Sequence, residues 1–363
     1  MPEGAQGTLP GTPAHAEPQA ATPRRHRLRK AVLGGAVALT LLVAAEGSLR
    51  ALPAPAIDRH EFTHNAVYWT FAADQHDLGV RHAERASLFQ LSTNAHGLRP
   101  PHHDVQRTPG TFRILALGDS TTFGWGVEDT QTWPWLLERE LAGPQGNCVE
   151  VVNGGQPGHT TFQGLRFWRE VGQLYQPDLV LVGYIVQDAR EVSYTDRSQA
   201  VLQSDGDFLS HHPLWTLQLY RALHRAIGRA RQDLVPANTR RVPLDQYADN
   251  LRTFADQIRS VGAEPVLFGF PLEVAGYTAE HRAVQAATAG RLGLEHIDLS
   301  DLTAGRSELY FAEDRGHANA RGNRAVAEAL AAWMRTNPGL VDRCGPLPPG
   351  TGEGSGRGGE SGS

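Results

Sequence analysis

Residues that bind metals or form disulfide networks are scarce in this sequence. Cysteine occurs twice among 363 residues, no CxxC spacing occurs, and the 16 histidines are scattered. We therefore expect no metal site, and we expect His159, His211 and His212 to be solvated loop residues. Positive charge is not in excess either, because the formal net charge is −5 at pH 7. This balance argues against a nucleic-acid partner, since proteins that bind nucleic acids usually carry a basic face.

The remaining composition is that of a globular protein of enzyme size. Hydrophobic residues make up 40% of the chain and charged residues 20%, which are ordinary values. Once the two unusual ends are set aside, about 240–280 residues remain. This length predicts one α/β domain with insertions, and no internal repeat is visible.

The N-terminal end differs from the rest in composition. Residues 1–30 are rich in alanine, proline and glycine, and they end in the basic block RRHRLRK at 24–30. We expect this tail to be disordered. Residues 31–52 begin with the apolar run AVLGGAVALTLLVAA. An apolar run behind basic residues is typical of a membrane anchor or of a cleaved signal peptide.

These two alternatives for residues 31–52 have different support. The uninterrupted apolar run is short for a membrane span, which favours a signal peptide. The long preceding tail and the modest cleavage candidate APAI at 54–57 favour an anchor, which is the interpretation we prefer. In both cases the rest of the chain faces outward. It is either tethered through a juxtamembrane lead-in at 53–110 or secreted after signal cleavage.

Between the two ends, apolar β-branched runs alternate with helical patterns. The expected strands are residues 113–117, 149–153, 178–184, 265–270 and 296–299. The expected helices are residues 133–141, 160–175, 247–262, 279–292 and 320–334. Near-continuous apolar strands between amphipathic helices indicate a parallel sheet covered on both faces, which is a three-layer α/β/α fold. Such folds place their sites at the carboxyl ends of the strands.

Two further segments lie outside this alternation. Residues 189–244 interrupt it after the third strand, and we expect this insertion to lie over the carboxyl-end face. Residues 345–363 form a glycine- and serine-rich tail. We expect this tail to be disordered, because its composition gives it no means of burying a core.

The two cysteines are candidates for one disulfide. Cys148 precedes the second strand, at the sheet end opposite the expected site. The last helix should return the chain to that same end before Cys344. An outward-facing domain lies in an oxidising compartment, where such a bridge can form. Two independent free thiols are the alternative.

Polar residues with catalytic potential follow the first strand. In RILALGDSTTFGWG, residues 113–126, the apolar strand is followed directly by Asp119 and Ser120. A serine hydroxyl becomes a nucleophile when a base takes its proton and an acid orients that base. Asp314 and His317 supply both types, since they stand three residues apart between the fifth strand and the last helix. We expect Asp119 to cap backbone amides of its turn rather than to transfer protons.

In these motifs the sequence resembles the SGNH hydrolases, also called GDSL-type lipases, esterases and acyltransferases. Gly118, Asp119 and Ser120 match the first motif of that family, and Asp314 with His317 matches the last. The turn NGGQPGHTT at 153–161 matches the second motif, and NAHGLRPP at 94–101 resembles the lead-in of membrane-tethered bacterial members. The resemblance implies a flavodoxin-like, doubly wound sheet of five parallel strands, with the hydrolase domain at 111–340.

The resemblance also implies roles for the site residues. Ser120 is the expected nucleophile, His317 the base and Asp314 the orienting acid. The backbone N–H groups of Ser120 and Gly158 are expected to bind the oxyanion, and Asn153 to stabilise the turn beside them. The implied substrate carries an O-acyl group, often O-acetyl, on a carbohydrate or another small ester. Transfer to water or to a second alcohol uses the same residues, and no cofactor is implied.

One motif departs from the family pattern. Where the family has Gly-x-Asn-Asp, the segment GYIVQDAR at 183–190 has Gln187 at the asparagine position, followed by Asp188. Glutamine carries the same amide donor one methylene further out, so it can complete the oxyanion site if the loop retracts by about 1 Å. A catalytically weak, surface-anchored glycan-binding protein is therefore the alternative to an esterase.

Overall fold

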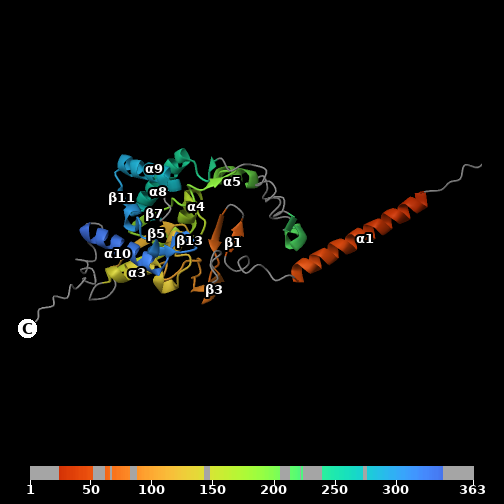
Figure 1. Ribbon diagram of the computed structural model, residues 1–363, viewed down its shortest axis with the longest axis horizontal. Coiled ribbons are helices and arrows are strands. Elements are labelled where there is room, and N and C mark those ends of the chain that lie inside the picture. The colour runs from red at the N-terminus through yellow and green to blue at the C-terminus, as the bar shows by residue number, and fades with distance from the viewer. Residues whose placement is uncertain are drawn as a thin grey trace, which may run out of the picture.

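The central sheet of the protein contains five parallel strands (Figure 1). They are β5 (Phe112–Gly118), β6 (Val149–Gly155), β7 (Leu179–Gly183), β10 (Glu264–Gly269) and β11 (Glu295–Asp298). Their spatial order is β11-β10-β7-β5-β6, so the first of them along the chain lies between the second and the third. This is the flavodoxin-like order expected from the sequence, and each strand ends within two residues of its predicted bounds.

The computed structural model describes most of the chain outside its two ends. The described residues are 24–51, 62–65, 68–81, 88–142, 148–204, 213–220, 222–223, 239–272 and 276–337. The predicted disorder of residues 1–23 and 345–363 concerns residues outside this description. So does the predicted solvation of His211 and His212.

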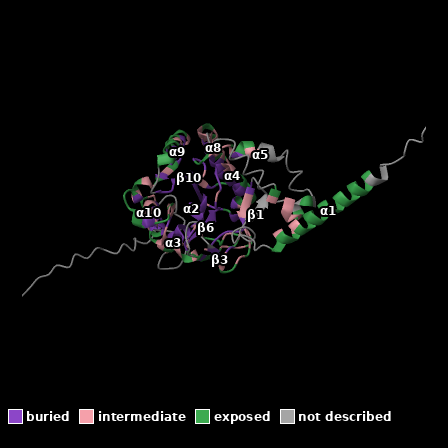
Figure 2. Cartoon of the chain, turned by 45° about the vertical axis from the view of Figure 1, so that its right-hand side comes forward, coloured by how far each residue is buried: buried purple, intermediate pink, exposed green. Residues whose placement is uncertain are grey.

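Helices cover both faces of the sheet, which confirms the three-layer prediction. On one face lie α3 (Trp133–Leu141) and α10 (Ala320–Thr336), and on the other lie α4 (Thr161–Glu170), α8 (Leu244–Ser260) and α9 (Ala279–Leu292). Because side chains alternate along a strand, the two faces of β5 belong to different clusters. Ile114 and Ala116 pack with α3 and α10, whereas Leu115 and Leu117 pack on the opposite side. Buried residues accordingly fill the space between sheet and helices (Figure 2).

Short elements connect the strands to the helices at the carboxyl end of the sheet. The helix α2 (Ser120–Phe123) follows β5, and the antiparallel hairpin of β12 (Tyr310–Phe311) and β13 (Asp314–Ala318) immediately precedes α10. The short 3₁₀ helices are η1 (Asp129–Gln131), η2 (Gly172–Tyr175), η3 (Pro213–Thr216), η4 (Gly276–Thr278), η5 (Ser300–Thr303) and η6 (Ser307–Leu309).

The segment predicted as a lead-in packs against the sheet domain. It contains two antiparallel hairpins, formed by β1 (Phe62–Asn65) with β2 (Tyr68–Phe71) and by β3 (Leu78–Arg81) with β4 (Leu88–Leu91). Phe71, Val80, Phe89 and Leu91 are buried in one cluster with Phe123 of α2. The packed domain therefore begins well before residue 111, because the hairpins cover the helix that starts with Ser120.

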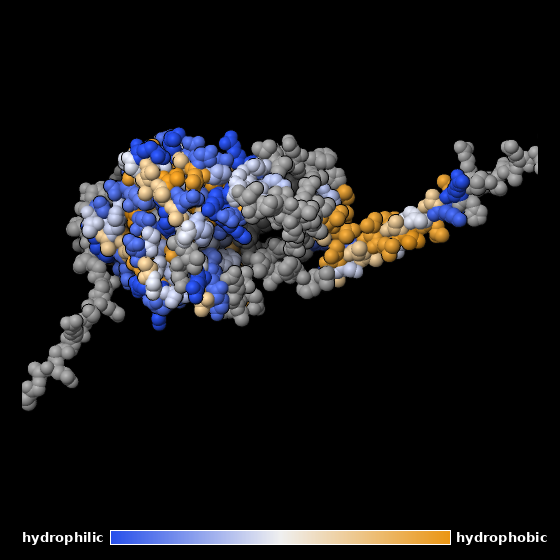
Figure 3. Space-filling model, turned by 45° about the horizontal axis from the view of Figure 1, so that its top comes forward, coloured by the Kyte–Doolittle hydropathy of each residue, from blue (hydrophilic) through white to orange (hydrophobic). Residues whose placement is uncertain are grey.

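The N-terminal helix α1 (Arg24–Ala51) projects away from the domain (Figure 1). Its part from Arg27 to Ala51 is apolar enough to cross a membrane, and at 25 residues it measures about 37 Å. Its apolar side chains are exposed along its length, and basic residues mark its N-terminal end (Figure 3). The basic block belongs to this helix rather than to a disordered tail, since arginine and lysine are good helix formers. The helix fits a signal sequence or an anchor.

The described parts of the insertion lie beside the strand ends. They include β8 (Glu191–Val192), which pairs antiparallel with β9 (Thr239–Arg240), and α5 (Asp196–Ser204). The backbone N–H of Val242 donates to the carbonyl of Asp188 at 3.2 Å, which ties the end of the insertion to the loop after β7. The insertion therefore begins and ends at the carboxyl-end face.

Cys148, which precedes β6, is disulfide-bonded. The chain contains two cysteines. The predicted partner, Cys344, lies outside the described residues.

Candidate active site

Ser120 stands directly beyond the carboxyl end of β5, at the start of α2. Asp119 is the N-terminal cap of this short helix. Its Oδ1 accepts hydrogen bonds from the backbone N–H and the hydroxyl of Thr121, at 2.9 and 2.8 Å. Burial raises the pKa of the Asp119 carboxyl, while the hydrogen bonds from Thr121 and the nearby His317 oppose this shift. The carboxylate therefore caps the turn that presents Ser120, which is the role expected from the sequence.

The hairpin before α10 brings an acid and a base to this serine. His317 Nε2 lies 2.7 Å from Ser120 Oγ, and His317 Nδ1 contacts Asp314 Oδ2. The backbone N–H of Gly316 donates to the other oxygen of Asp314 at 2.9 Å. Both side chains lie on strand β13, which was not among the strands expected from the sequence, and its pairing with β12 fixes them on one short element.

These contacts define the proton positions that a nucleophilic serine requires. A carboxylate accepts hydrogen bonds, so His317 Nδ1 carries the proton that faces Asp314. The other ring nitrogen, Nε2, can then accept the proton of the Ser120 hydroxyl. The structure thus brings together the three residues that the sequence predicted for nucleophile, base and orienting acid.

The loop after β6 approaches α2 closely. A Cβ atom on Gly155 would lie 2.2 Å from the backbone nitrogen of Phe123, so a larger residue there would force the two elements apart. Asn153 is buried; its Oδ1 accepts from the N–H of Gly155 at 3.1 Å, and its Nδ2 donates to the Phe123 carbonyl at 3.4 Å. Asn153 therefore stabilises the turn beside the serine, as its predicted role requires.

Gly158 adopts a left-handed backbone conformation, with φ of +80°, which glycine adopts more readily than other residues. The indole Nε1 of Trp69, in β2, donates to the carbonyl of Pro157 at 2.8 Å. That carbonyl and the N–H of Gly158 belong to one trans peptide and point in opposite directions. Trp69 therefore fixes the direction of the Gly158 N–H, for which no hydrogen-bond partner occurs among the described residues.

Gln187 follows β7, and its amide oxygen is held by an arginine. Arg241 Nη1 donates to Gln187 Oε1 at 3.1 Å and to the carbonyl of Gly158 at 2.8 Å. Because an arginine can only donate, the amide nitrogen of Gln187 must face away from it. That nitrogen has no hydrogen-bond partner within the described part of the chain, and the same is true of the backbone N–H of Ser120.

Asp188, expected to support the site, caps the helix that follows β6. It is fully buried, and it accepts from the backbone N–H and the hydroxyl of Thr161. Burial raises the pKa of Asp188 to about 7, against the hydrogen bonds from Thr161. The residue thus holds α4 to the loop after β7 through a carboxyl group that is costly to ionise.

This raised pKa predicts a pH-dependent effect of Asp188→Asn. A carboxyl whose pKa is higher in the folded state contributes stability below its unfolded pKa, and that stability is lost as the pH rises through about 7. Asparagine keeps the acceptor for Thr161 but carries no charge. We expect Asp188→Asn to stabilise the protein at pH 8 relative to pH 5, by up to roughly 3 kcal/mol.

Urea unfolding of the parent and the variant at both pH values measures this difference. Asp249→Asn is the control, because Asp249 is largely exposed, and we expect its effect to stay within about 0.5 kcal/mol at both pH values. An effect of Asp188→Asn that does not change with pH would show that the carboxyl titrates normally.

The prediction that His159 is solvated is wrong. The residue is buried, with its Nε2 2.6 Å from the carbonyl of Trp69, and its ring contacts Tyr68 and Phe167. Burial lowers the pKa of His159 to about 3, so the ring is neutral at physiological pH. His159 is buried because β2, which lies far away in the sequence, covers the loop after β6.

One spacing typical of zinc sites does occur in the sequence. Residues 60–64 read HEFTH. An HExxH site needs a helix, which places both histidines on one face, whereas residues 62–65 form strand β1 and residues 60–61 lie outside the description. Among the described residues, no group of three or more His, Cys, Asp or Glu side chains is placed to hold a metal ion.

Arg99 supports the serine turn and was not singled out by the sequence, although it lies in NAHGLRPP. Its buried guanidinium donates to the carbonyls of Phe123, Gly124 and Val127 and pairs with Asp129. The only sequence signal was the likeness of its segment to the lead-in of membrane-tethered proteins. No local pattern identifies the carbonyls that it binds.

A known protein family matches the part of the chain that carries the serine, the acid and the base. The model of the GDSL-like lipase/acylhydrolase family matches residues 116–325, more than half of the 363 residues. The protein belongs to this family. The matched range includes Ser120, Gly158, Gln187, Asp314 and His317. As a GDSL-type enzyme, the protein is an esterase or acylhydrolase, and the SGNH resemblance inferred from its motifs is confirmed.

Individual relatives of this GDSL-type enzyme are distant. An arylesterase from Vibrio mimicus is 37% identical over 70 residues, which are 19% of this chain and 34% of the relative, so the chain spans about a third of that relative's length. A lipase/acylhydrolase structure from Enterococcus faecalis has 18% identity and a TM-score of 0.44, covering 62% of this chain and 97% of its own. An acetylxylan esterase from Geobacillus stearothermophilus, solved as a catalytic mutant, has 17% identity and a TM-score of 0.41, covering 61% and 93%.

Proposed function

We propose that this GDSL-type enzyme cleaves O-acyl esters by nucleophilic attack of Ser120, with His317 as base and Asp314 as its orienting acid. The observation that carries the proposal is the 2.7 Å contact between His317 Nε2 and Ser120 Oγ. The contact of Asp314 with the other ring nitrogen supports it, since a base needs an orienting partner. The alternative of a catalytically weak glycan-binding protein gives no reason for these three side chains to meet.

The proposed reaction has two acyl-transfer steps. Ser120 Oγ attacks the ester carbonyl as its proton passes to His317 Nε2, and the carbonyl oxygen becomes an oxyanion. The backbone N–H groups of Ser120 and Gly158 and the amide nitrogen of Gln187 donate to that oxyanion. His317 then protonates the leaving alcohol, and an acyl-enzyme on Ser120 remains. Water or a second alcohol attacks it with the same base, which gives hydrolysis or transfer.

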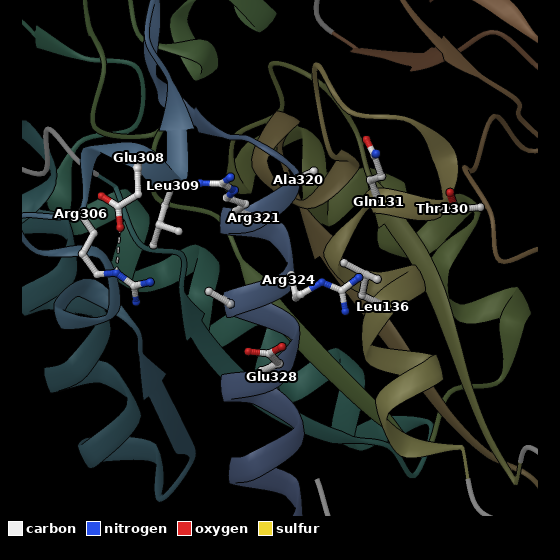
Figure 4. Close-up of a pocket in the computed structure, with 11 residues that line it drawn as sticks. Thr130, Gln131, Leu136, Arg306, Glu308, Leu309, Ala320, Arg321, Arg324 and Glu328 are labelled. Atoms are coloured by element: carbon white, nitrogen blue, oxygen red, sulfur yellow. Dashed lines mark hydrogen bonds and ion pairs between the residues drawn. The ribbon is translucent and has the colours of Figure 1, made fainter. Parts of the chain in front are cut away.

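We place the alcohol part of the substrate in grooves beside the hairpin that carries the acid and the base. A cavity of about 510 Å³ is lined by Phe311 of β12, by Asn319 and Arg321 after β13, and by Phe89 of the lead-in. A second cavity of about 430 Å³ continues along α10, where Arg321 and Arg324 line it from one side (Figure 4). Polar side chains beside aromatic ones suit a carbohydrate hydroxyl surface. Together with the family resemblance, this lining supports a carbohydrate or another small ester as the proposed substrate, and the resemblance alone supports a short acyl group such as acetyl.

We further propose that α1 anchors the enzyme, with its catalytic domain outside the cytoplasm. The carboxylate of Glu46, near the C-terminal end of α1, accepts from the backbone N–H groups of Gln218 and Leu219 at 2.9 and 2.8 Å. These residues belong to the insertion, so α1 makes contacts that a cleaved signal peptide would lose. Cleavage with secretion is the alternative topology.

A serine-directed phosphonate tests the proposed nucleophile. We expect one covalent adduct per chain, mapped to Ser120 by peptide mass spectrometry, because the Ser120 hydroxyl has a base, His317 Nε2, within hydrogen-bond distance. Ser120→Ala should abolish labelling, whereas the exposed Ser198→Ala should label normally. An adduct on another serine, or no adduct on folded protein, would contradict the proposal and favour the binding protein.

A further inference from the structure

Arg241, at the end of the insertion, donates hydrogen bonds to Gly158 and Gln187. These are two of the residues whose N–H groups the proposed mechanism places at the oxyanion. Arg241 Nη1 donates to the carbonyl of Gly158 at 2.8 Å and to Oε1 of Gln187 at 3.1 Å. Its side chain is 12% exposed. One guanidinium nitrogen therefore links the loop after β6 to the loop after β7.

The other side of the guanidinium is held by a buried carboxylate. Arg241 Nε and Nη2 donate to the two oxygens of Asp196, at 3.0 and 2.9 Å. Asp196, at the start of α5, also accepts from the hydroxyl of Thr160 at 2.8 Å and from Nε2 of Gln163 at 3.0 Å. A planar guanidinium paired along one edge cannot rotate, so Nη1 keeps its direction toward both acceptors.

This arrangement fixes two of the donors to the oxyanion. Gln187 has one more rotatable bond than asparagine, and its amide can rotate unless one end is held. Arg241 holds the oxygen end, which leaves Nε2 as the end that faces the substrate. At Gly158, the carbonyl is held by Arg241 and the preceding peptide by Trp69. The glycine is thus fixed from both sides.

We propose that Arg241 is a positioning residue for the oxyanion site, where it makes glutamine effective at the position of the family's asparagine. The pairing with Asp196 orients the guanidinium. Both residues belong to the insertion, so the insertion contributes to the geometry of the oxyanion site. Preorganised donors stabilise an oxyanion because they need not reorient during the reaction. The inference rests on the proposed esterase mechanism.

Arg241→Lys is the main test, with p-nitrophenyl acetate as substrate. Lysine can keep the charge pair with Asp196, but its ammonium lacks the planar fork that bonds both acceptors at once. We expect kcat to fall by about 10–100-fold, with KM changed by less than about threefold and the pH profile of kcat/KM unchanged. The neighbouring Arg240→Lys is the control, since Arg240 pairs with the exposed Glu191 and Glu280, and it should retain parental kcat.

A second variant removes both charges of the pair. Arg241→Met combined with Asp196→Asn leaves no unpaired buried charge, so it covers the case in which Arg241→Lys fails to fold. We expect the same loss of kcat in this double variant, with a melting temperature that confirms folding. Parental kcat in either folded variant would overturn the proposal.

Coupling to Gln187 distinguishes positioning from general structural damage. Gln187→Ala should lower kcat by about 100-fold, and Arg241→Lys should then cost clearly less than it does in the parent. If Arg241→Lys lowers kcat by the same factor in Gln187→Ala as in the parent, the proposal is overturned. Phosphonate labelling of Ser120 in the parent keeps the two hypotheses apart. If the phosphonate does not label Ser120 in the parent, the proposed function itself fails. If Ser120 is labelled but Arg241→Lys leaves kcat unchanged, only the positioning role of Arg241 is rejected.

Discussion

Ser120→Ala should lower kcat for p-nitrophenyl acetate by at least about 10⁴-fold, with little change in KM. The reason is that alanine removes the oxygen that lies 2.7 Å from His317 Nε2, so no acyl-enzyme can form. Steady-state rates measured at several substrate concentrations separate kcat from KM. Since Ser120 is nearly buried and the change removes one atom, the melting temperature should stay close to that of the parent.

Two further variants test whether the loss of activity is specific to Ser120. His317→Ala should lose activity to a similar extent, and combining it with Ser120→Ala should cost little more, because residues of one catalytic unit are not additive. Ser198→Ala, on the exposed surface of α5, should retain parental kcat. Activity of Ser120→Ala within tenfold of the parent would remove Ser120 from the chemistry.

Arg99→Met should lower the free energy of unfolding by about 3–5 kcal/mol. Methionine fills much of the same volume, but it removes the charge that pairs with Asp129 and one donor from each of the carbonyls of Phe123, Gly124 and Val127. Loss of a charged donor is costly for a buried partner, and here the partners lie in the turn that follows the nucleophile. Urea unfolding followed by tryptophan fluorescence measures the loss.

A matched arginine on the surface provides the control. Arg252 pairs with Asp249 while both remain more than half exposed, so Arg252→Met should change the free energy of unfolding by less than about 0.5 kcal/mol. If Arg99→Met costs no more than this control, the lead-in does not brace the serine turn. Failure of Arg99→Met to fold under conditions in which Arg252→Met folds agrees with the expected loss.

The strands and catalytic residues that the sequence predicted were all identified from patterns of residues close together in the chain. The alternation of near-continuous apolar strands with amphipathic helices predicted a parallel sheet covered on both faces. Ser120 follows its strand directly, and Asp314 and His317 stand three residues apart. Each of these motifs is weak alone, and their order between the expected strands and helices is what identified the site. The strand after Phe311 was missed because it pairs over only a few residues.

By itself, then, the sequence determined the parallel sheet, the apolar N-terminal segment and the acid, base and serine at the strand ends. The tertiary structure alone decided how the lead-in packs, why His159 is buried, and which side chains brace the proposed oxyanion donors. Trp69 reaches Pro157 across 88 residues, and Arg241 reaches Gly158 across 83. Contacts at such separations leave no periodicity in the sequence. They form because buried carbonyls and carboxylates need donors, and folding brings those donors within hydrogen-bond distance.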